Sequence, residues 1–514
     1  MSDERLLTRR QVLRLSGAAA AGLALGSLPR WGRAAGSSAM PLPIPTLIEA
    51  RDGEPVKLLM QNTRHRFGFG PAVAARGISS SYLGPVVRVR SGDTIPFHVE
   101  NRLEEETTVH WHGMLIPSQV DGGPHNTIEP GAVWKPELSV KQAPATNWYH
   151  PHPHRRTGRQ VYSGLAGMMI VADGADRDRG LPVTYGVDDL PIVLQDKRFG
   201  PNGELIYALN MMDVMHGFQG NTLVVNGAIG PVASVPPGFV RLRLLNAANA
   251  RNFDLRFSDQ RPFFVIAGDS GFLAEPVEVR NLIIAPAERY EVLVNFSDGK
   301  PVELLTTFQA QGMGPGMMMM PRGGPFGFAS GAQVFMQFKP DSTLKASITR
   351  LPQKLARVAP PDFKSVVAQR TFVLDMMGMH MAGMMGMGGP GGMMGRGFGD
   401  GGGPGQFMGI NGRPFAMDRV DVTVKQKTAE IWEIVSPMMP HPFHVHGASF
   451  RILSNGGGLP TLEQSGWKDV VLVWQRAEIL VRFDQPATPK KPFMYHCHIL
   501  EHEDHGLMGQ FATV

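Results

Sequence analysis

Three well-separated stretches of the chain repeat one pattern, and this recurrence constrains the fold more than any other feature. The stretches span residues 93–113, 239–253 and 429–447. Each has an alternating apolar and polar run, a polar break and a second short run. Alternation with a period of two is typical of a β-strand with one buried face. Because the copies lie far apart in a 514-residue chain, they predict repeated β-sheet domains and not a solenoid.

The spacing predicts three consecutive β-sandwich domains, at about 45–175, 176–345 and 346–514. Asn226-Gly227 precedes the second copy and Asn411-Gly412 precedes the third, and this residue pair predicts a tight turn. Histidines mark the first and third copies, whereas the second has Asn249 and Arg251 instead. The middle domain is therefore expected to be a metal-free spacer that positions the other two.

An export signal is predicted at the N-terminus, in residues 1–35. Arg9 and Arg10 precede an apolar run from Leu15 to Leu28, and small residues follow up to Ala35. This order resembles a twin-arginine signal peptide, and the apolar run is too short for a membrane span. We therefore expect the twin-arginine export machinery to carry the folded protein to the periplasm or another extracytoplasmic compartment, with no stable membrane span after cleavage.

The basic charge of the chain is largely a property of this leader. The formal net charge is +5, and the six arginines and two acids before residue 36 contribute +4 of it. The mature protein is thus close to neutral, which argues against nucleic acid as a partner.

Metal binding is indicated by four His-x-His pairs. They are His110/His112, His150/His152, His444/His446 and His496/His498. On a strand, residues two apart project from the same face, so each pair would present two imidazoles together. One such pair is weak evidence, but four in one chain are strong evidence. Eight imidazoles exceed the ligand set of one tetrahedral ion and suit three metals, shared as three, three and two.

The single cysteine, Cys497, lies between two of these histidines and predicts a path for electrons. Its side chain is expected on the opposite face of a strand from His496 and His498. With His441 and His502 it completes a set of two imidazoles and one thiolate, which suits copper in electron transfer. A metal held by this set would be joined through few covalent bonds to the metals held by the flanking imidazoles. One cysteine also excludes an internal disulfide framework.

These motifs resemble those of the multicopper oxidases, most closely the bacterial cuprous oxidases of copper tolerance. The resemblance rests on residues 110–113, 119–124, 148–152, 157–161, 441–447 and 496–508. It covers nearly the whole mature chain. It implies an all-β fold of three consecutive cupredoxin-like β-sandwich (Greek-key) domains, four copper ions as cofactors, and the four-electron reduction of O2 to water.

The resemblance also implies which residues hold which copper. His441, Cys497 and His502 would hold the type 1 copper, which receives electrons from the substrate. His110 and His444 would hold the type 2 copper. One type 3 copper would be held by His112, His150 and His498, and the other by His152, His446 and His496.

Two acids and the axial position complete the predicted centre. Asp121 and Glu503 match acidic positions of the family near the copper cluster, where a carboxylate can relay protons or hydrogen-bond a ligand histidine, and both roles stay open. The weak axial ligand of a type 1 copper usually lies ten residues after the cysteine, where this chain has Leu507, followed by Met508. Leucine cannot coordinate, so we expect a raised copper potential, with ligation by Met508 as the alternative.

Residues 376–408 form a Met/Gly-rich insertion in the third domain. They contain ten methionines and fourteen glycines, a composition that cannot build a packed core. Thioethers select Cu(I), so the tract is expected to collect Cu(I) above the type 1 site; a disordered insertion is the plainer alternative. The resemblance implies a substrate Cu(I) site at Asp375, Met376, Met379 and Met439. Pro437 stands where the family has an aspartate, which leaves the strength of that site open.

The sequence therefore predicts an exported multicopper oxidase that oxidises Cu(I), together with phenols or other laccase substrates, and acts in copper tolerance. The alternative is a laccase that acts mainly on phenols or aromatic amines, with the methionine tract as a lid. A copper storage protein would need no electron path. A copper nitrite reductase would leave several histidines unused, and a degenerate structural relative would have lost ligand histidines. We expect a monomer.

Overall fold

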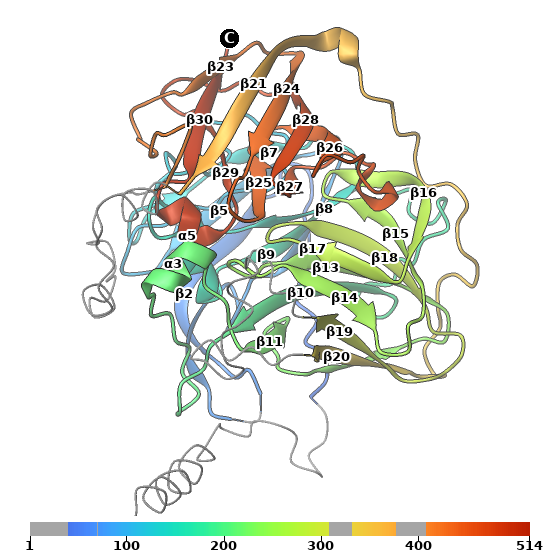
Figure 1. Ribbon diagram of the computed structural model, residues 1–514. Coiled ribbons are helices and arrows are strands. Elements are labelled where there is room, and N and C mark those ends of the chain that lie inside the picture. Colours follow the sequence, from blue (N-terminus) through green and yellow to red (C-terminus); the bar gives the residue numbers. More distant parts are fainter. Residues whose placement is uncertain (1–39, 69, 308–330, 377–407) are drawn as a thin grey trace, which may run out of the picture. The chain divides into compact units, whose positions relative to one another are not determined.

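The computed structural model describes residues 40–68, 70–307, 331–376 and 408–514. Within these ranges the chain forms six β-sheets, and each sheet draws its strands from one of three consecutive segments (Figure 1). The predicted all-β fold of three consecutive β-sandwich domains is confirmed. The predicted export signal 1–35 and residues 377–407 of the insertion lie outside the described residues. The domain boundaries near residues 175 and 345 stay a prediction.

The first segment forms a sheet of order β1-β4-β9-β8 and a sheet of order β3-β2-β5-β6, in which β7 also pairs with β5. Its strands are β1 Leu47–Glu49, β2 Val56–His65, β3 Val73–Ile78, β4 Val86–Arg90, β5 Thr94–Asn101, β6 Val133–Trp134, β7 Glu137–Ser139, β8 Ala145–Tyr149 and β9 Gly167–Ala172. In β5 every second side chain is buried. One face of this strand therefore packs on the core, as the alternating sequence predicts.

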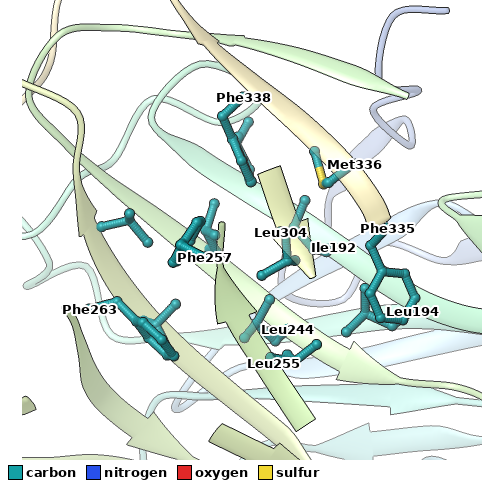
Figure 2. Packing of buried hydrophobic residues seen from close by; sticks show 14 of the residues in the cluster. Ile192, Leu194, Leu244, Leu255, Phe257, Phe263, Leu304, Phe335, Met336 and Phe338 are labelled. Carbon is teal, nitrogen blue, oxygen red and sulfur yellow. The ribbon is translucent and has the colours of Figure 1, made fainter. Parts of the chain in front are cut away.

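The second segment forms sheets of order β11-β10-β13-β18-β15-β16 and β12-β20-β19-β14-β17. Its strands are β10 Asp189–Lys197, β11 Thr222–Val225, β12 Val232–Val235, β13 Phe239–Asn246, β14 Phe253–Phe257, β15 Phe263–Gly268, β16 Gly271–Val279, β17 Asn281–Ile284, β18 Arg289–Asn295, β19 Val302–Thr307 and β20 Ala332–Pro340. Side chains from both sheets share one buried apolar cluster: Ile192 and Leu244 come from the first sheet, and Phe257, Leu304 and Phe338 from the second (Figure 2). This packing defines a β-sandwich.

The third segment forms sheets of order β22-β21-β24-β28-β26 and β23-β30-β29-β25-β27. Its strands are β21 Val366–Asp375, β22 Gly409–Ile410, β23 Val422–Val424, β24 Thr428–Val435, β25 His441–Val445, β26 Ser449–Asn455, β27 Val470–Val473, β28 Arg476–Phe483, β29 Phe493–Cys497 and β30 Met508–Thr513. Strands β25 and β29 are neighbours, and both carry predicted metal ligands.

The described helices are short. They are α2 Thr157–Tyr162, α3 Met211–His216 and α5 Leu500–Asp504, with 3-10 turns η2 Phe363–Ser365 and η3 Leu462–Gln464. Helix α5 contacts both α2 and α3, so elements of all three segments meet there, and α3 and α5 lie side by side in Figure 1. In the described ranges, no helix has the length and apolar character needed to span a bilayer.

The two predicted Asn-Gly turns are confirmed. Asn226 and Gly227 have φ angles of +49° and +81°, and Asn411 and Gly412 have φ angles of +54° and +70°. Positive φ at both central residues is the geometry of the tight hairpin turn that favours this residue pair.

Candidate metal centre

Cys497 lies in a buried group with His441 and His502, whose candidate ligand atoms are within 4.8 Å of one another. Cys497 Sγ lies 3.6 Å from His502 Nδ1 and accepts a hydrogen bond from the Ile499 N–H at 3.3 Å. His502 Nε2 lies 3.2 Å from the carbonyl oxygen of Met215. A carbonyl only accepts, so Nε2 carries the proton and the lone pair is on Nδ1, the nitrogen near the sulfur. Burial raises the pKa of Cys497, so a thiolate here needs a bound cation.

The axial position distinguishes Leu507 from Met508. Leu507 packs in the same apolar cluster as Cys497, whereas Met508 packs in a separate cluster with Phe415 and Met494. Leu507 directly precedes β30, which begins at Met508, and successive side chains of extended backbone point to opposite faces. Leu507 is therefore the residue on the side of the sulfur. Whether any residue ligates axially stays a prediction.

Strand β29 separates the thiol from the imidazoles beside it. Cys497 belongs to an apolar cluster. The neighbouring His496 instead has its Nε2 atom 3.1 Å from His446 Nε2 and 3.3 Å from His152 Nε2. In the sheet, His444 of β25 pairs with His496. The cysteine and the adjacent histidines thus serve two different groups of ligands, which is the arrangement that an electron path requires.

The eight histidines of the His-x-His pairs converge on one buried centre. Each is at most 1 % exposed. Candidate ligand groups within it are His110, His444 and His446; His110, His112 and His150; and His152, His446 and His496. His498 joins them, with its ring centroid 5.1 Å from that of His112. The centre is shared between the first and third segments, while the assignment of each histidine to one metal stays a prediction.

None of the four pairs lies wholly on a strand, contrary to the prediction. His446 and His498 directly follow the last residues of β25 and β29, and the two pairs of the first segment lie outside its strands. His110 and His150 are joined by a one-residue bridge, with N–H to carbonyl distances of 2.8 and 3.1 Å, and His112 and His152 lie outside any strand. Pro151 has no N–H to continue the pairing. The imidazoles of the first segment therefore converge through this single bridge and not through strand alternation.

Hydrogen bonds determine which nitrogen of several rings carries the proton. Four Nδ1 atoms face backbone carbonyl oxygens: His110 with Asp121 at 3.0 Å, His150 with Pro151 at 2.8 Å, His444 with Asp469 at 2.7 Å, and His496 with Cys497 at 3.0 Å. His446 Nδ1 donates to Asp121 Oδ2 at 2.8 Å, and His112 uses Nε2 toward Asp469 Oδ1 at 3.2 Å. Each of these rings keeps a lone pair on its other nitrogen.

These lone pairs fit metal ions. Nε2 of His110, His150 and His444 and Nδ1 of His112 are buried without a hydrogen-bond partner among the described residues. His446 Nε2 and His496 Nε2 both carry lone pairs and lie only 3.1 Å apart. Burial lowers the pKa of both rings, to about 3 for His496, so protonation does not relieve this repulsion near neutral pH. Cations would satisfy all of these nitrogens, and imidazole is a good ligand for copper.

The two predicted acids lie against the same histidines. Besides its bond to His446, Asp121 Oδ2 lies 3.3 Å from His110 Nδ1. Glu503 Oε1 lies 3.3 Å from His152 Nδ1, and its Oε2 lies 3.3 Å from His496 Nδ1. Both carboxyl groups are buried. Burial and the nearby Asp504 raise the pKa of Glu503.

Sequence reasoning missed a third acid, Asp469. It is 1 % exposed and contacts His112 through its carboxylate and His444 through its carbonyl oxygen. The available signal was the charged pair Lys468-Asp469 directly before the apolar strand β27, because buried charges next to such a strand need partners.

Several methionines lie in or against the large apolar cluster that also contains Cys497. Met215, Met376 and Met408 belong to its apolar cluster, and Met211 and Met439 pack against that cluster. Met211 and Met215 come from α3 and were not predicted. Asp375 is half-buried, and its Oδ2 accepts a hydrogen bond from the Gly412 N–H at 2.7 Å. Met379 lies outside the described residues.

Comparisons with known proteins agree with this geometry. Three family profiles, each described as multicopper oxidase, match residues 59–176, 210–303 and 395–514. A solved laccase-like multicopper oxidase, CueO of a lignin-degrading Ochrobactrum sp., is 46% identical with a TM-score of 0.82, over 92% of this chain and all of that one. A laccase of Pediococcus acidilactici is 31% identical with a TM-score of 0.76, over 94% and 95% of the two chains.

Curated relatives carry a different kind of name. The cell division protein FtsP of Salmonella typhimurium is 37% identical over 98% of both chains. The family profiles nevertheless span well over half of the chain, and they include all eleven predicted copper ligands. The chain belongs to the multicopper oxidase family.

Proposed function

We propose that this protein is an exported, extracytoplasmic oxidase that takes electrons one at a time from Cu(I) and reduces O2 to water, in the service of copper tolerance. Four Cu(I) ions would be oxidised for each O2, with four protons consumed and two waters formed. The proposed role extends to phenols as secondary donors. The leader 1–35 would direct twin-arginine export, and the mature chain would be a monomer.

The proposed cofactors are four coppers. His441, Cys497 and His502 would hold the type 1 ion, and His110 and His444 the type 2 ion. The type 3 pair would be held by His112, His150 and His498 and by His152, His446 and His496. Bound at these positions, copper supplies one-electron transfer and the reduction of O2. The protein contributes fixed tautomers, exclusion of water, and a covalent link from Cys497 to the histidines on either side of it.

The observation that supports Cu(I) as the donor is the group of methionines in and against the apolar cluster that contains Cys497. Met211, Met215 and Met439 pack in or against one apolar cluster with the sulfur of the proposed type 1 site. A core needs apolar volume, which leucine also provides, whereas only methionine adds a soft thioether that binds Cu(I). We propose that Asp375, Met376, Met379 and Met439 bind this substrate, with Met211 added from α3.

The test compares donors in a tract deletion. Removing residues 378–406 and joining the ends with a short Gly/Ser linker should lower kcat/KM for Cu(I) at least ~10-fold, because soft ligands that bind the substrate are lost. The deletion keeps Met376 and Met408, which are buried. Oxygen uptake with a bulky phenol should stay the same or rise. Met60→Leu is the matched control, since Met60 is buried in the first segment's core. Unchanged Cu(I) turnover in the deletion would refute the proposed role of residues 378–406 in binding Cu(I).

Similarities to two groups of relatives support alternative functions. The Ochrobactrum relative is described as having oxidase activity towards lignin model compounds and lignosulfonate. This similarity favours phenols as the electron donor. High phenol turnover in the wild type and little Cu(I) turnover would support this laccase alternative. The FtsP relatives are named for cell division, and that name describes a process and not a reaction. Oxygen uptake by the copper-loaded protein separates an oxidase from a protein with a structural role.

Glu503 is proposed to pass protons to oxygen, and its replacement by glutamine should show this. Glu503 touches one ring nitrogen of His152 and one of His496, so it lies at the edge of the centre where protons are consumed. Glutamine keeps the size of the side chain but cannot release a proton. We expect kcat for oxygen uptake to fall about 100-fold or more. The blue colour and the rate at which Cu(I) bleaches it should be unchanged, and wild-type kcat would contradict the proposal.

A further inference from the structure

A buried ion pair joins the middle segment to the histidines of the metal centre. Arg289, at the start of β18, is fully buried, and its guanidinium donates to both carboxylate oxygens of Asp469 at 2.6 and 2.5 Å. Asp469 Oδ1 in turn lies 3.2 Å from His112 Nε2, and the Asp469 carbonyl oxygen lies 2.7 Å from His444 Nδ1. One aspartate therefore connects an arginine of the second segment with a histidine of each of the other two.

The guanidinium has no freedom to move. Its Nε–H donates to the Thr146 carbonyl oxygen and its second Nη1–H to the Ala287 carbonyl oxygen, both at 3.0 Å. The second Nη2–H is shared between the Asp269 carbonyl oxygen at 2.9 Å and Asn147 Oδ1 at 3.2 Å. Gly113 allows this close approach, because a Cβ at that position would lie 2.6 Å from Arg289 Nη2 and 2.8 Å from Asp469 Oδ2. A planar fork with partners on every side holds a carboxylate in one orientation.

Asp269 holds the backbone of both Arg289 and Asp469. Its Oδ1 accepts from the Arg289 N–H at 2.8 Å, and its Oδ2 accepts from the N–H groups of Asp469 and Val470 at 3.3 and 3.2 Å. Lys468 Nζ lies 3.0 Å from the same Oδ2 atom. The backbone and the side chain of Asp469 are therefore both held by residues of the middle segment.

We infer that Arg289 is a positioning residue of the copper centre. By holding the Asp469 carboxylate it keeps the proton of His112 on Nε2 and leaves Nδ1 to the metal. The same carboxylate lies 3.7 Å from His444 Nδ1, and the carbonyl that this nitrogen faces belongs to the peptide group that Asp269 holds through the Val470 N–H. The middle segment thus contributes to the centre and is more than the spacer that the sequence suggested. This inference rests on the copper centre proposed above, but not on whether Cu(I) or a phenol is the donor.

The test is Arg289→Lys, with Arg243→Lys as the matched control, in copper-loaded full-length protein. Arg243 is also buried and paired, with Asp189 and Glu291, but neither of these carboxylates contacts a ligand histidine, whereas Asp469 does. Copper retention against a graded chelator, the type 2 electron paramagnetic resonance spectrum and the blue absorption are measured. For Arg289→Lys we expect copper affinity at the histidine centre to fall ~10–100-fold. The type 2 spectrum should change and the blue absorption should remain.

Asp469→Asn is the second variant and replaces Arg289→Lys if that variant does not fold. It keeps an oxygen for His112 but weakens the bond to Arg289, so we expect a change in the same direction. The inference is wrong if these variants keep the wild-type type 2 spectrum and copper affinity, or if Arg243→Lys loses copper equally. Wild-type protein that retains no copper at the histidine centre would refute the proposed function itself, so the two failures are distinguishable.

Discussion

Replacing Cys497 with serine is expected to remove the blue colour of the copper-loaded protein and to lower oxygen uptake with every donor at least roughly a thousandfold. The thiolate is the one soft anionic ligand of the proposed type 1 site, and serine cannot take its place as a copper ligand. The fold should survive, because serine is slightly smaller and can still accept the hydrogen bond that Ile499 N–H gives to the sulfur. Copper content should fall by one ion per chain.

Met508→Leu is the matched control for this substitution. Met508 is buried and lies close to Cys497 in the sequence. It packs with Phe415 and Met494 and not in the apolar cluster that contains Cys497. The colour and the turnover should therefore stay at wild-type levels in this variant. A loss of colour in Met508→Leu would show that this methionine ligates the copper after all. If the Cys497→Ser protein still oxidises Cu(I) or phenol at the wild-type rate, the proposed electron path through Cys497 is wrong.

The features of this centre that could be predicted are those that depend only on residues close together in the sequence. His496 and Cys497 are adjacent on β29, so the period of two places them in different surroundings without any knowledge of the fold. The Asn411-Gly412 turn was predictable for the same reason, since its positive φ angles are a property of those two residues. The repeats were enough to indicate three domains because each repeat carries its own strand pattern.

What could not be predicted depends on contacts between distant segments. His112 meets Asp469 across 357 positions of sequence, and Asp469 meets Arg289 across 180. No period or spacing relates such residues, so only the packed structure reveals that one orients another. The hydrogen bond from His502 to the carbonyl oxygen of Met215 is a further case. Every residue has a backbone carbonyl, so the sequence does not indicate which one accepts this bond.

Removal of copper is expected to make the protein unstable in mild acid. Burial lowers the pKa of nine of the predicted ligand histidines: His112, His150, His152, His441, His444, His446, His496, His498 and His502. In the unfolded chain the same side chains take up protons near pH 6.5. Below that pH these histidines bind more protons in the unfolded state than in the folded state, so their contribution to the free energy of unfolding falls as pH falls.

The size of the effect follows from the number of histidines. At pH 5.5 each neutral buried histidine lowers the free energy of unfolding by about 1 kcal/mol relative to pH 7. Nine of them together reach on the order of 10 kcal/mol, and Glu503 and Asp504, whose raised pKa values make them take up protons in the folded state, offset part of this loss. For His441 and His496, whose pKa values fall to about 3, the loss continues down to about pH 3. Bound copper should oppose it, because the metal binds only the deprotonated rings.

The measurement is the urea midpoint of the copper-free protein between pH 7.5 and pH 5, followed by circular dichroism. We expect the midpoint to fall steeply below pH 6.5 and the protein to unfold without urea near pH 5, while the copper-loaded protein resists. His496→Gln removes one of the protonating groups, so the dependence of its midpoint on pH should be shallower by about one proton. A copper-free protein with the same midpoint at pH 5 and pH 7 would mean that these histidines can take up protons without unfolding, and that the centre is far more open to water than its burial indicates.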